Sequence, residues 1–259
     1  ERVVRILDAV VAAAEAKAEE YAEWAVTETG MGVVEHKALK NRMCSRGLWD
    51  AYRDHDYVSP RIRHDDKILE LPRPAGVIFA LTPTTNPIAT VYFKVLLALM
   101  TRNAIVVSPH PGAKAVCADA VRMLSDAAVA AGAPDGCIQV VDEPSVPLIE
   151  ALMADQTTDV IVATGGSAVV RAAYRSGNPA LGVGPGNVPA FVDATADIAA
   201  AAERIIDSKA FDNSVLCTNE SAVIVEEEVA DQLVRELGRQ GGHVCTPDEV
   251  EQIREHLFP

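Results

Sequence analysis

The stretch that decides the fold is PAGVIFALTPTTNPIATVYFKVLLALMTRNAIVVSPHP, residues 74–111. It holds two short apolar runs, at 76–81 and 104–108, on either side of an apolar helical pattern at Ile88–Met100. Continuously apolar strands joined by a helix are typical of a parallel sheet whose two faces are both covered. The stretch therefore predicts one strand–helix–strand unit of an α/β domain.

The same alternation continues toward the C-terminus. Further apolar runs lie at 137–141 and 159–164, and helical patterns lie at Ala113–Ala131 and Val146–Met153. We therefore expect an α/β fold with a doubly wound, Rossmann-like parallel sheet, in which ligands bind at the carboxyl ends of the strands.

Helical patterns precede the sheet. Apolar residues at helical spacing predict a long amphipathic helix that ends at Gly30 and Gly32, and a second helix from Glu35 to about Tyr52. Residues 55–74 are polar and mixed in charge, which predicts a loop or an extended ribbon.

The pattern changes again near Ile205–Phe211, where a helical stretch gives way to a polar segment. We place a domain boundary there. Residues 1–204 are expected to form a nucleotide-binding domain that includes the N-terminal helices. Residues 205–259 are expected to begin a second α/β domain, the catalytic one.

Composition and charge narrow the function. Acidic residues number 37 and basic residues 23, and the net charge of −14 repels phosphate backbones, so nucleic acid is not an expected partner. The most apolar stretch, Ile88–Met100, is interrupted by Lys94 and is shorter than the ~20 residues of a membrane span, so no membrane contact is expected. The five cysteines contain no CxxC pair, which argues against a metal site and for reduced thiols in the cytosol.

Two turns follow apolar runs and could meet a ligand. Thr164, Gly165 and Gly166 join a strand to a helix, and glycines there let a phosphate approach the backbone and the helix N-terminus. An ordinary strand-to-helix turn is the alternative. In TPTTNP (82–87), Asn86 either caps the next helix or offers an amide donor at the edge of the sheet.

Two other features need their context. Cys217 lies in a polar setting, FDNSVLCTNES, although a lone cysteine is more often a small buried hydrophobe. The block GVGPGN (182–187) does not have the G-x-G-x-x-G spacing, and a strand follows it instead of a helix. It is therefore not a dinucleotide-binding fingerprint.

Taken in order, five blocks of the sequence resemble the aldehyde dehydrogenase superfamily. The blocks are PAGVIFALTPTTNP (74–87), RNAIVVSPHPGA (102–113), ATGGSAVVRAAYRSG (163–177), GVGPGNVPAFVD (182–193) and SKAFDNSVLCTNES (208–221). More narrowly, they resemble the CoA-acylating branch, which includes the acylating acetaldehyde and succinate-semialdehyde dehydrogenases. Members of this family are considerably longer, so the chain resembles a C-terminally truncated member.

The resemblance implies a role for particular residues. Cys217 matches the nucleophile, and Asn86 matches the amide that stabilises the oxyanion. The positions that match the binding site for NAD or NADP are Thr82, Pro83, Ser108, Pro109, His110, Thr164, Gly165, Gly166 and Gly184. The segment around Ser108 lacks the lysine and the acidic residue of the hydrolytic branch, so both NAD and NADP stay open.

One position separates the two branches. Hydrolytic relatives carry a Glu that activates water just before their glycine pair, and the matching position here is Val183. A valine cannot take a proton, whereas CoA brings a thiol that is intrinsically far more nucleophilic than water. The resemblance therefore implies reversible oxidation of an aldehyde to acyl-CoA, with coenzyme A as co-substrate.

The sequence leaves two alternatives. The first is a hydrolytic aldehyde dehydrogenase, which Val183 disfavours. The second is a truncated, inactive nucleotide-binding remnant, which the end at Pro259 favours. For the full-length parent we expect a homo-oligomer, either free in the cytoplasm or inside a bacterial microcompartment.

Overall fold

The computed structural model describes residues 1–258 and forms two compact units, Glu1–Pro185 and Gly186–Pro259. The sequence places the domain boundary at 204/205, which lies inside helix α9 (Ile198–Ala210). The second unit begins earlier because the strand that precedes α9 pairs with the strand that follows it. The second unit is compact because these two strands pair. The change in apolar pattern near Ile205–Phe211 does not reveal that pairing.

A five-stranded parallel sheet forms the centre of the first unit, with the order β5-β4-β3-β6-β7. Its strands are β3 (Val77–Thr82), β4 (Ala104–Pro109), β5 (Ile138–Val140), β6 (Val160–Thr164) and β7 (Ala180–Val183). The chain winds outward from β3 to β5 and then crosses back to β6, so the strand order reverses between β3 and β6. This confirms the predicted doubly wound α/β fold, in which ligands bind where the order reverses.

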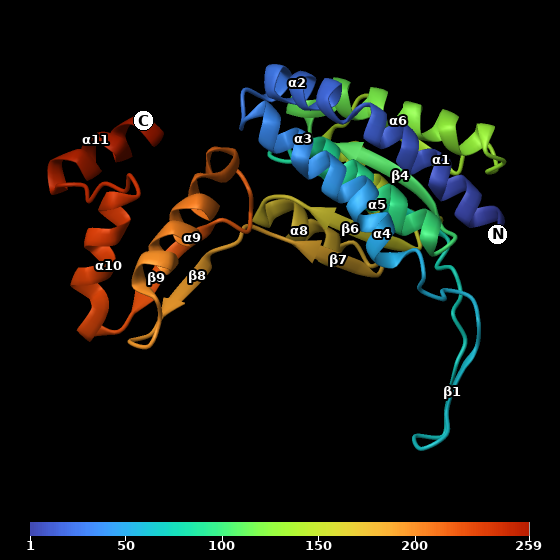
Figure 1. Ribbon diagram of the computed structural model, residues 1–259. Helices are drawn as coiled ribbons and strands as arrows, with labels where there is room; N and C mark the ends of the chain where they lie inside the picture. The colour runs from blue at the N-terminus through green and yellow to red at the C-terminus, as the bar shows by residue number, and fades with distance from the viewer. Residues whose placement is uncertain (259) are drawn as a thin grey trace. The chain divides into compact units, whose positions relative to one another are not determined.

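Helices cover both faces of the sheet (Figure 1). On one face, α5 (Pro87–Met100) and α6 (Lys114–Ala130) pack on β3, β4 and β5, together with the N-terminal helices. On the other face, α7 (Val146–Ala154) and α8 (Ser167–Arg175) pack on β3 and β6. Successive side chains of β3 point to opposite faces of the sheet and so enter both cores. Ala80 packs in the core under α5 and α6, and Phe79 and Leu81 pack in the core under α7 and α8.

The N-terminal helices differ from the prediction at one point. The single long helix is divided at Lys17 into α1 (Arg2–Ala16) and α2 (Ala18–Thr29), and Gly30 ends α2 in the left-handed conformation. The predicted second helix is α3 (Val34–Arg42), a π-helical turn (Met43–Gly47) and α4 (Leu48–Tyr52). The expected ribbon is a hairpin of β1 (Arg61–Arg63) and β2 (Ile68–Glu70).

The second unit is a strand–helix–strand motif followed by two helices. Its elements are β8 (Val188–Val192), α9, a short 3₁₀ turn (Phe211–Ser214), β9 (Glu220–Val225), α10 (Glu227–Arg239) and α11 (Pro247–Leu257). The strands pair in parallel, and a small core of Val192, Ile198, Ala202 and Leu233 joins them to α9 and α10.

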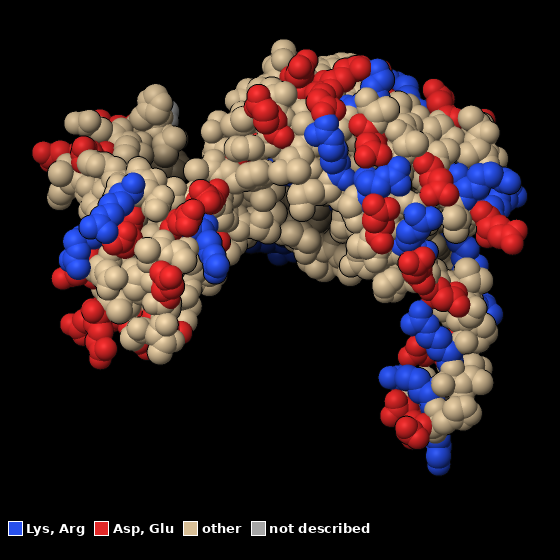
Figure 2. All heavy atoms as spheres, viewed as in Figure 1, with Lys and Arg blue, Asp and Glu red and all other residues tan. Residues whose placement is uncertain are grey.

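The surface carries both signs of charge. Figure 2 shows acidic and basic side chains interleaved on the visible face of each unit. The hairpin illustrates this mixture, because Arg63 pairs with both Asp66 and Glu70. Among residues 1–258, none of the helices combines the length and the apolar character that crossing a membrane requires.

Candidate active site

The two ligand-facing turns lie on the same edge of the first unit's sheet. β3 ends at Thr82 and β6 at Thr164, and these two parallel strands are direct neighbours. The loop that carries Asn86 and the turn that carries Gly165 therefore leave the sheet at its carboxyl edge. Their predicted placement at one edge is confirmed.

The glycine turn has the shape of an anion-binding site. The Gly165 N–H donates a hydrogen bond to the Val183 carbonyl (3.1 Å), and Gly166 is the N-cap residue of α8. A β-carbon on Gly166 would meet no atom within 4 Å among the described residues, so its outer side is open. The first N–H groups of a helix have no partner within the helix, so the start of α8 favours a negative charge.

Two lysines of α3 hold the loop that carries Asn86, and one of them contacts its side chain. The Lys40 ammonium donates a hydrogen bond to the Asn86 amide oxygen, and the Lys37 ammonium donates one to the Thr85 carbonyl (2.8 Å). The Asn86 NH₂ group donates one hydrogen bond to the Thr85 hydroxyl (3.3 Å), and its second hydrogen can be donated to a ligand. The sequence analysis missed these buried lysines, although their spacing of three residues places them on one helix face.

The other expected cofactor-binding residues differ in accessibility. Thr82, Ser108 and Pro109 are buried, and the Ser108 hydroxyl has no hydrogen-bond partner among residues 1–258. Pro83 and Gly184 are half-buried. His110 is exposed, and its Nδ1 accepts a hydrogen bond from the Gly112 N–H (3.1 Å). Within the segment 108–110, the His110 side chain is therefore the one that can meet a ligand directly.

Cys217 lies on an exposed turn between the 3₁₀ turn and β9 of the second unit. Three consecutive residues before it, Asp212, Asn213 and Ser214, have positive φ angles, which are unfavourable for residues other than glycine. Asn219 holds the other side of the turn, because its amide donates to the Ser208 carbonyl. Backbone strain of this kind persists only where surrounding contacts impose it, and it clusters at functional sites.

The other cysteines are less accessible to reagents than Cys217, with the exception of Cys245. Burial raises the pKa of the Cys117 thiol to about 12, and burial also raises the pKa values of Cys44 and Cys137. Cys245 is exposed, as Cys217 is. Of these two exposed thiols, Cys217 is the one that follows the strained turn.

A buried lysine joins the two central strands. The Lys94 ammonium, on α5, donates hydrogen bonds to the Leu81 carbonyl of β3 (2.6 Å) and the Val162 carbonyl of β6 (2.8 Å). Burial lowers the pKa of Lys94 to about 7. The sequence analysis treated this lysine only as an interruption of an apolar helix. Its position bridges the strands at the point where their order reverses.

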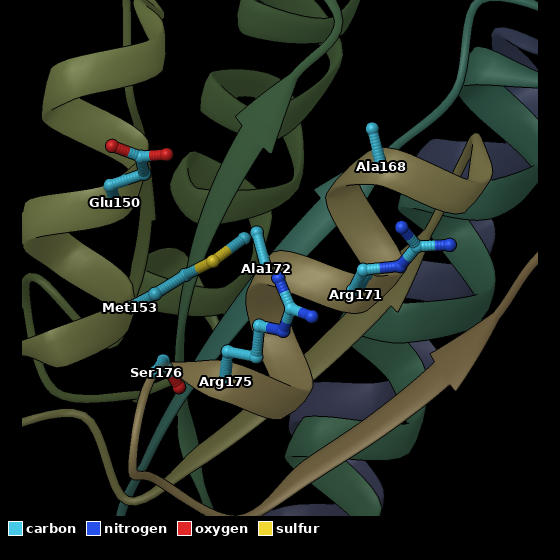
Figure 3. Close-up of a pocket in the computed structure, with 7 residues that line it drawn as sticks. All are labelled: Glu150, Met153, Ala168, Arg171, Ala172, Arg175 and Ser176. Carbon is cyan, nitrogen blue, oxygen red and sulfur yellow. The ribbon is translucent and has the colours of Figure 1, made fainter.

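A groove of about 430 Å³ lies between α7 and α8 (Figure 3). Arg171 and Arg175 extend from α8 along it, and Glu150 and Met153 come from α7. The groove follows the helix whose N-terminus carries the glycine turn. Its two arginines, four residues apart on one helix face, offer positive charge to an anionic ligand.

Together, the parallel sheet and its reversed strand order define a doubly wound α/β protein, which also carries a cationic groove and an exposed cysteine. The sequence profile described as "Aldehyde dehydrogenase family" matches residues 1–246. The chain therefore belongs to the aldehyde dehydrogenase family.

Curated relatives are aldehyde dehydrogenases by name, and one of them is named as acetylating. The chain is 41% identical over 252 residues to the bifunctional aldehyde-alcohol dehydrogenase of Escherichia coli K12, which covers 96% of this chain and 28% of that protein. It is 38% identical to the succinate-semialdehyde dehydrogenase (acetylating) of Clostridium kluyveri, covering 93% of this chain and 53% of that protein. The chain thus spans about half the length, or less, of these relatives.

Solved structures agree with the fold. An acetylating aldehyde dehydrogenase from Geobacillus thermoglucosidasius superposes with a TM-score of 0.93 at 39% identity, over 100% of this chain and 57% of that one. A propionaldehyde dehydrogenase from Rhodopseudomonas palustris, solved with bound CoA and an acylated cysteine, gives 0.86 at 34% identity, over 100% and 58%. An engineered glycolyl-CoA reductase with bound NADP⁺ gives the same TM-score and identity, over 100% and 58%.

Proposed function

We propose that this chain is the cofactor-binding part, together with the nucleophile, of a CoA-acylating aldehyde dehydrogenase. The observation that carries the proposal is Val183, which stands where hydrolytic relatives carry a water-activating Glu. It lies at the end of β7 with an exposed side chain, and it cannot act as a base. The acetylating names of the Clostridium kluyveri and Geobacillus thermoglucosidasius relatives support the acylating reaction.

The cofactor would lie along the carboxyl edge of the sheet, with its phosphates at the turn of Thr164, Gly165 and Gly166. The open side of Gly166 fits this group, because a phosphate can approach the backbone there. Thr82, Pro83 and Gly184 would line the path through their backbone, and the segment Ser108–Pro109–His110 would approach the adenine ribose. The groove beside Arg171 would take the nucleotide half of NAD, NADP or CoA.

The chemistry begins at Cys217. Its thiolate would attack the aldehyde carbonyl carbon, and an amide NH₂ group, the role that the resemblance gives to Asn86, would stabilise the oxyanion that forms. One such donor contributes about 3–4 kcal/mol to the transition state. When bound, NAD⁺ or NADP⁺ supplies the acceptor for the hydride that leaves this carbon as the C=O bond re-forms. The product is a thioester on Cys217.

Acyl transfer completes the cycle. The CoA thiolate attacks the thioester carbonyl, the bond to the Cys217 sulfur breaks, and acyl-CoA leaves while the cysteine regains its thiolate. Without a base at position 183, water competes poorly for the same carbonyl. The steps are reversible, so the enzyme can also reduce acyl-CoA to the aldehyde. We expect the whole protein to be a homo-oligomer in the cytosol or in a microcompartment.

The test is one assay of the full-length protein with NAD⁺ or NADP⁺ and a panel of short aldehydes, with and without CoA. Steady-state NAD(P)H formation that requires CoA, and that a Cys217→Ala variant abolishes, is the expected result. Steady formation of acid without CoA would assign the protein to the hydrolytic branch. No turnover with any aldehyde would favour an inactive nucleotide-binding protein.

A further inference from the structure

Three metal-ligand side chains meet in the loop between α10 and α11 of the second unit. The ligand atoms of His243, Cys245 and Glu249 all lie within 4.8 Å of one another, and the His243 Nε2 is 3.1 Å from a Glu249 carboxylate oxygen. We propose that this cluster binds a divalent transition-metal ion, with Zn²⁺ as the best match. The cysteine spacing predicts no metal site, and the proposed enzymatic activity does not require one. A metal site here would therefore be a further function of the second unit.

The backbone brings these side chains together for local reasons. Gly241 has a φ of +96°, and a β-carbon on Gly242 would stand 2.9 Å from the Leu237 carbonyl oxygen, so the chain turns tightly at the end of α10. His243 and Cys245 follow two residues apart, and in an extended stretch such residues face the same side. The turn thus directs both side chains toward the start of α11.

Glu249 is held in place by the cap of α11. The Thr246 hydroxyl accepts a hydrogen bond from the Glu249 N–H, and one Glu249 carboxylate oxygen accepts one from the Thr246 N–H (2.7 Å). A carboxylate has two oxygens, so it can hold this capping box and still offer an oxygen to a metal. The third ligand is therefore positioned before any ion binds.

The donor set favours zinc over the common hard cations. One imidazole nitrogen, one thiolate and one carboxylate match the ligands that Zn²⁺ takes at ~2.0–2.3 Å, whereas Ca²⁺ and Mg²⁺ prefer oxygen ligands alone. Tetrahedral coordination at those lengths separates ligand atoms by roughly 3.3–3.8 Å, so the cluster would contract by about 1 Å. His243 and Cys245, which are exposed on the loop, can make that movement while Glu249 stays in the capping box. A water would complete the fourth position.

The site would strengthen the attachment of α11. Within the described part of the chain, α11 buries none of its residues, and its apolar Val250 and Ile253 are exposed. The helix is therefore joined to the unit mainly through the loop that precedes it. An ion held by His243, Cys245 and Glu249 would tie its first turn to that loop, and binding to the folded form alone would stabilise it.

Cobalt(II) titration of the chelator-treated chain tests the proposal directly. We expect a near-ultraviolet thiolate-to-cobalt charge-transfer band and visible bands of tetrahedral intensity, both removed by Zn²⁺. Cys245→Ser should abolish the thiolate band, and His243→Ala should weaken Co²⁺ affinity at least tenfold. Glu249→Gln should weaken it too, although Gln keeps the capping box, so a loss there reports on the ligand and not on the helix.

Two controls separate this site from other thiols and histidines. Cys217→Ser should keep the cobalt–thiolate band, and His256→Ala, also on α11, should keep the affinity. Zn²⁺ should protect Cys245 from iodoacetamide and leave Cys217 reactive. A wild-type chain without the thiolate band, a band that survives in Cys245→Ser, or a band lost in Cys217→Ser would each overturn the proposal. Far-ultraviolet circular dichroism of each variant shows that the fold is kept.

Discussion

Gly186 lies directly against the backbone of Cys217: a β-carbon at position 186 would stand 2.5 Å from the Cys217 carbonyl oxygen. Carbon and oxygen atoms that are not bonded do not approach that closely, so only glycine fits there without moving the cysteine. Gly186, at the start of the second unit, therefore supports the turn that carries Cys217, although in sequence the block 182–187 looks like an imperfect nucleotide fingerprint.

Gly186→Ala should lower turnover of the full-length enzyme by about 10²-fold, because a displacement of the nucleophile by about 1 Å costs that much. The measurement is single-turnover NAD(P)H formation together with the thermal midpoint. Gly238→Ala is the matched control, since a β-carbon there meets nothing within 4 Å in the described chain. Equal activity of the two variants would contradict a supporting role for Gly186.

Gly166→Asp should weaken NAD(P)⁺ binding at least tenfold while leaving the thermal midpoint unchanged or higher. Aspartate is a good N-cap residue and its negative charge is favourable at a helix N-terminus, so the substitution should not lower the stability of the folded protein. The same carboxylate occupies the N–H groups that a phosphate would use and repels the phosphate. Calorimetric titration of cofactor into both proteins measures the effect. Unaltered affinity would mean that the turn is only structural.

Lys94 makes stability depend on pH. Its pKa falls from 10.5 to about 7 on burial, so between these values the unfolded chain binds a proton that the folded chain does not. The unfolding free energy contributed by Lys94 therefore rises with pH, by up to about 1.4 kcal/mol per unit. Urea unfolding at pH 7.5 and 9.5 should show this gain in the wild type and not in Lys94→Met. Parallel changes in both proteins would refute it.

Val183→Glu should raise CoA-independent acid formation in the full-length enzyme. A positioned general base contributes about 10²–10⁴-fold in favourable cases, and we expect at least tenfold here. The exposed side chain of Val183 gives the carboxylate room without disturbing a core. Acid is measured with aldehyde and cofactor in the absence of CoA, and Val183→Gln serves as the isosteric control. An identical rate in the Glu and Gln variants would count against the missing-base argument.

Iodoacetamide should label Cys217 before Cys44, Cys117 and Cys137 at neutral pH. The sequence alone predicts Cys217 as the fastest of all five thiols, and the structure adds Cys245 as an exposed competitor. Burial raises the pKa of the other three and shields them, which slows thiolate chemistry. Peptide mapping over time measures the order. Labelling of Cys117 before Cys217 would contradict the prediction that Cys217 is the more accessible thiol.

The alternation of strands and helices and the position of the turns can be predicted from the amino-acid sequence alone. Runs such as 76–81 and 159–164 are recognisable because a strand buried on both faces must be apolar at every position. The turn at Gly165 and Gly166 is recognisable because glycine punctuates a strand-to-helix junction. These features depend on neighbours a few residues apart, so the local pattern carries them, and with them most of the Rossmann-like fold.

The contacts between residues that are distant in the sequence depend on how the helices and strands pack in three dimensions. Lys40 reaches Asn86 from 46 residues away, and Lys94 joins carbonyls of β3 and β6. The boundary at Gly186 depends on the pairing of β8 with β9. The burial of Ser108 depends on the helices that pack over β4. These contacts form because covering the apolar sheet brings separate segments together. The same packing determines which polar groups become hydrogen-bond partners. The local periodicity of the sequence does not predict these pairs.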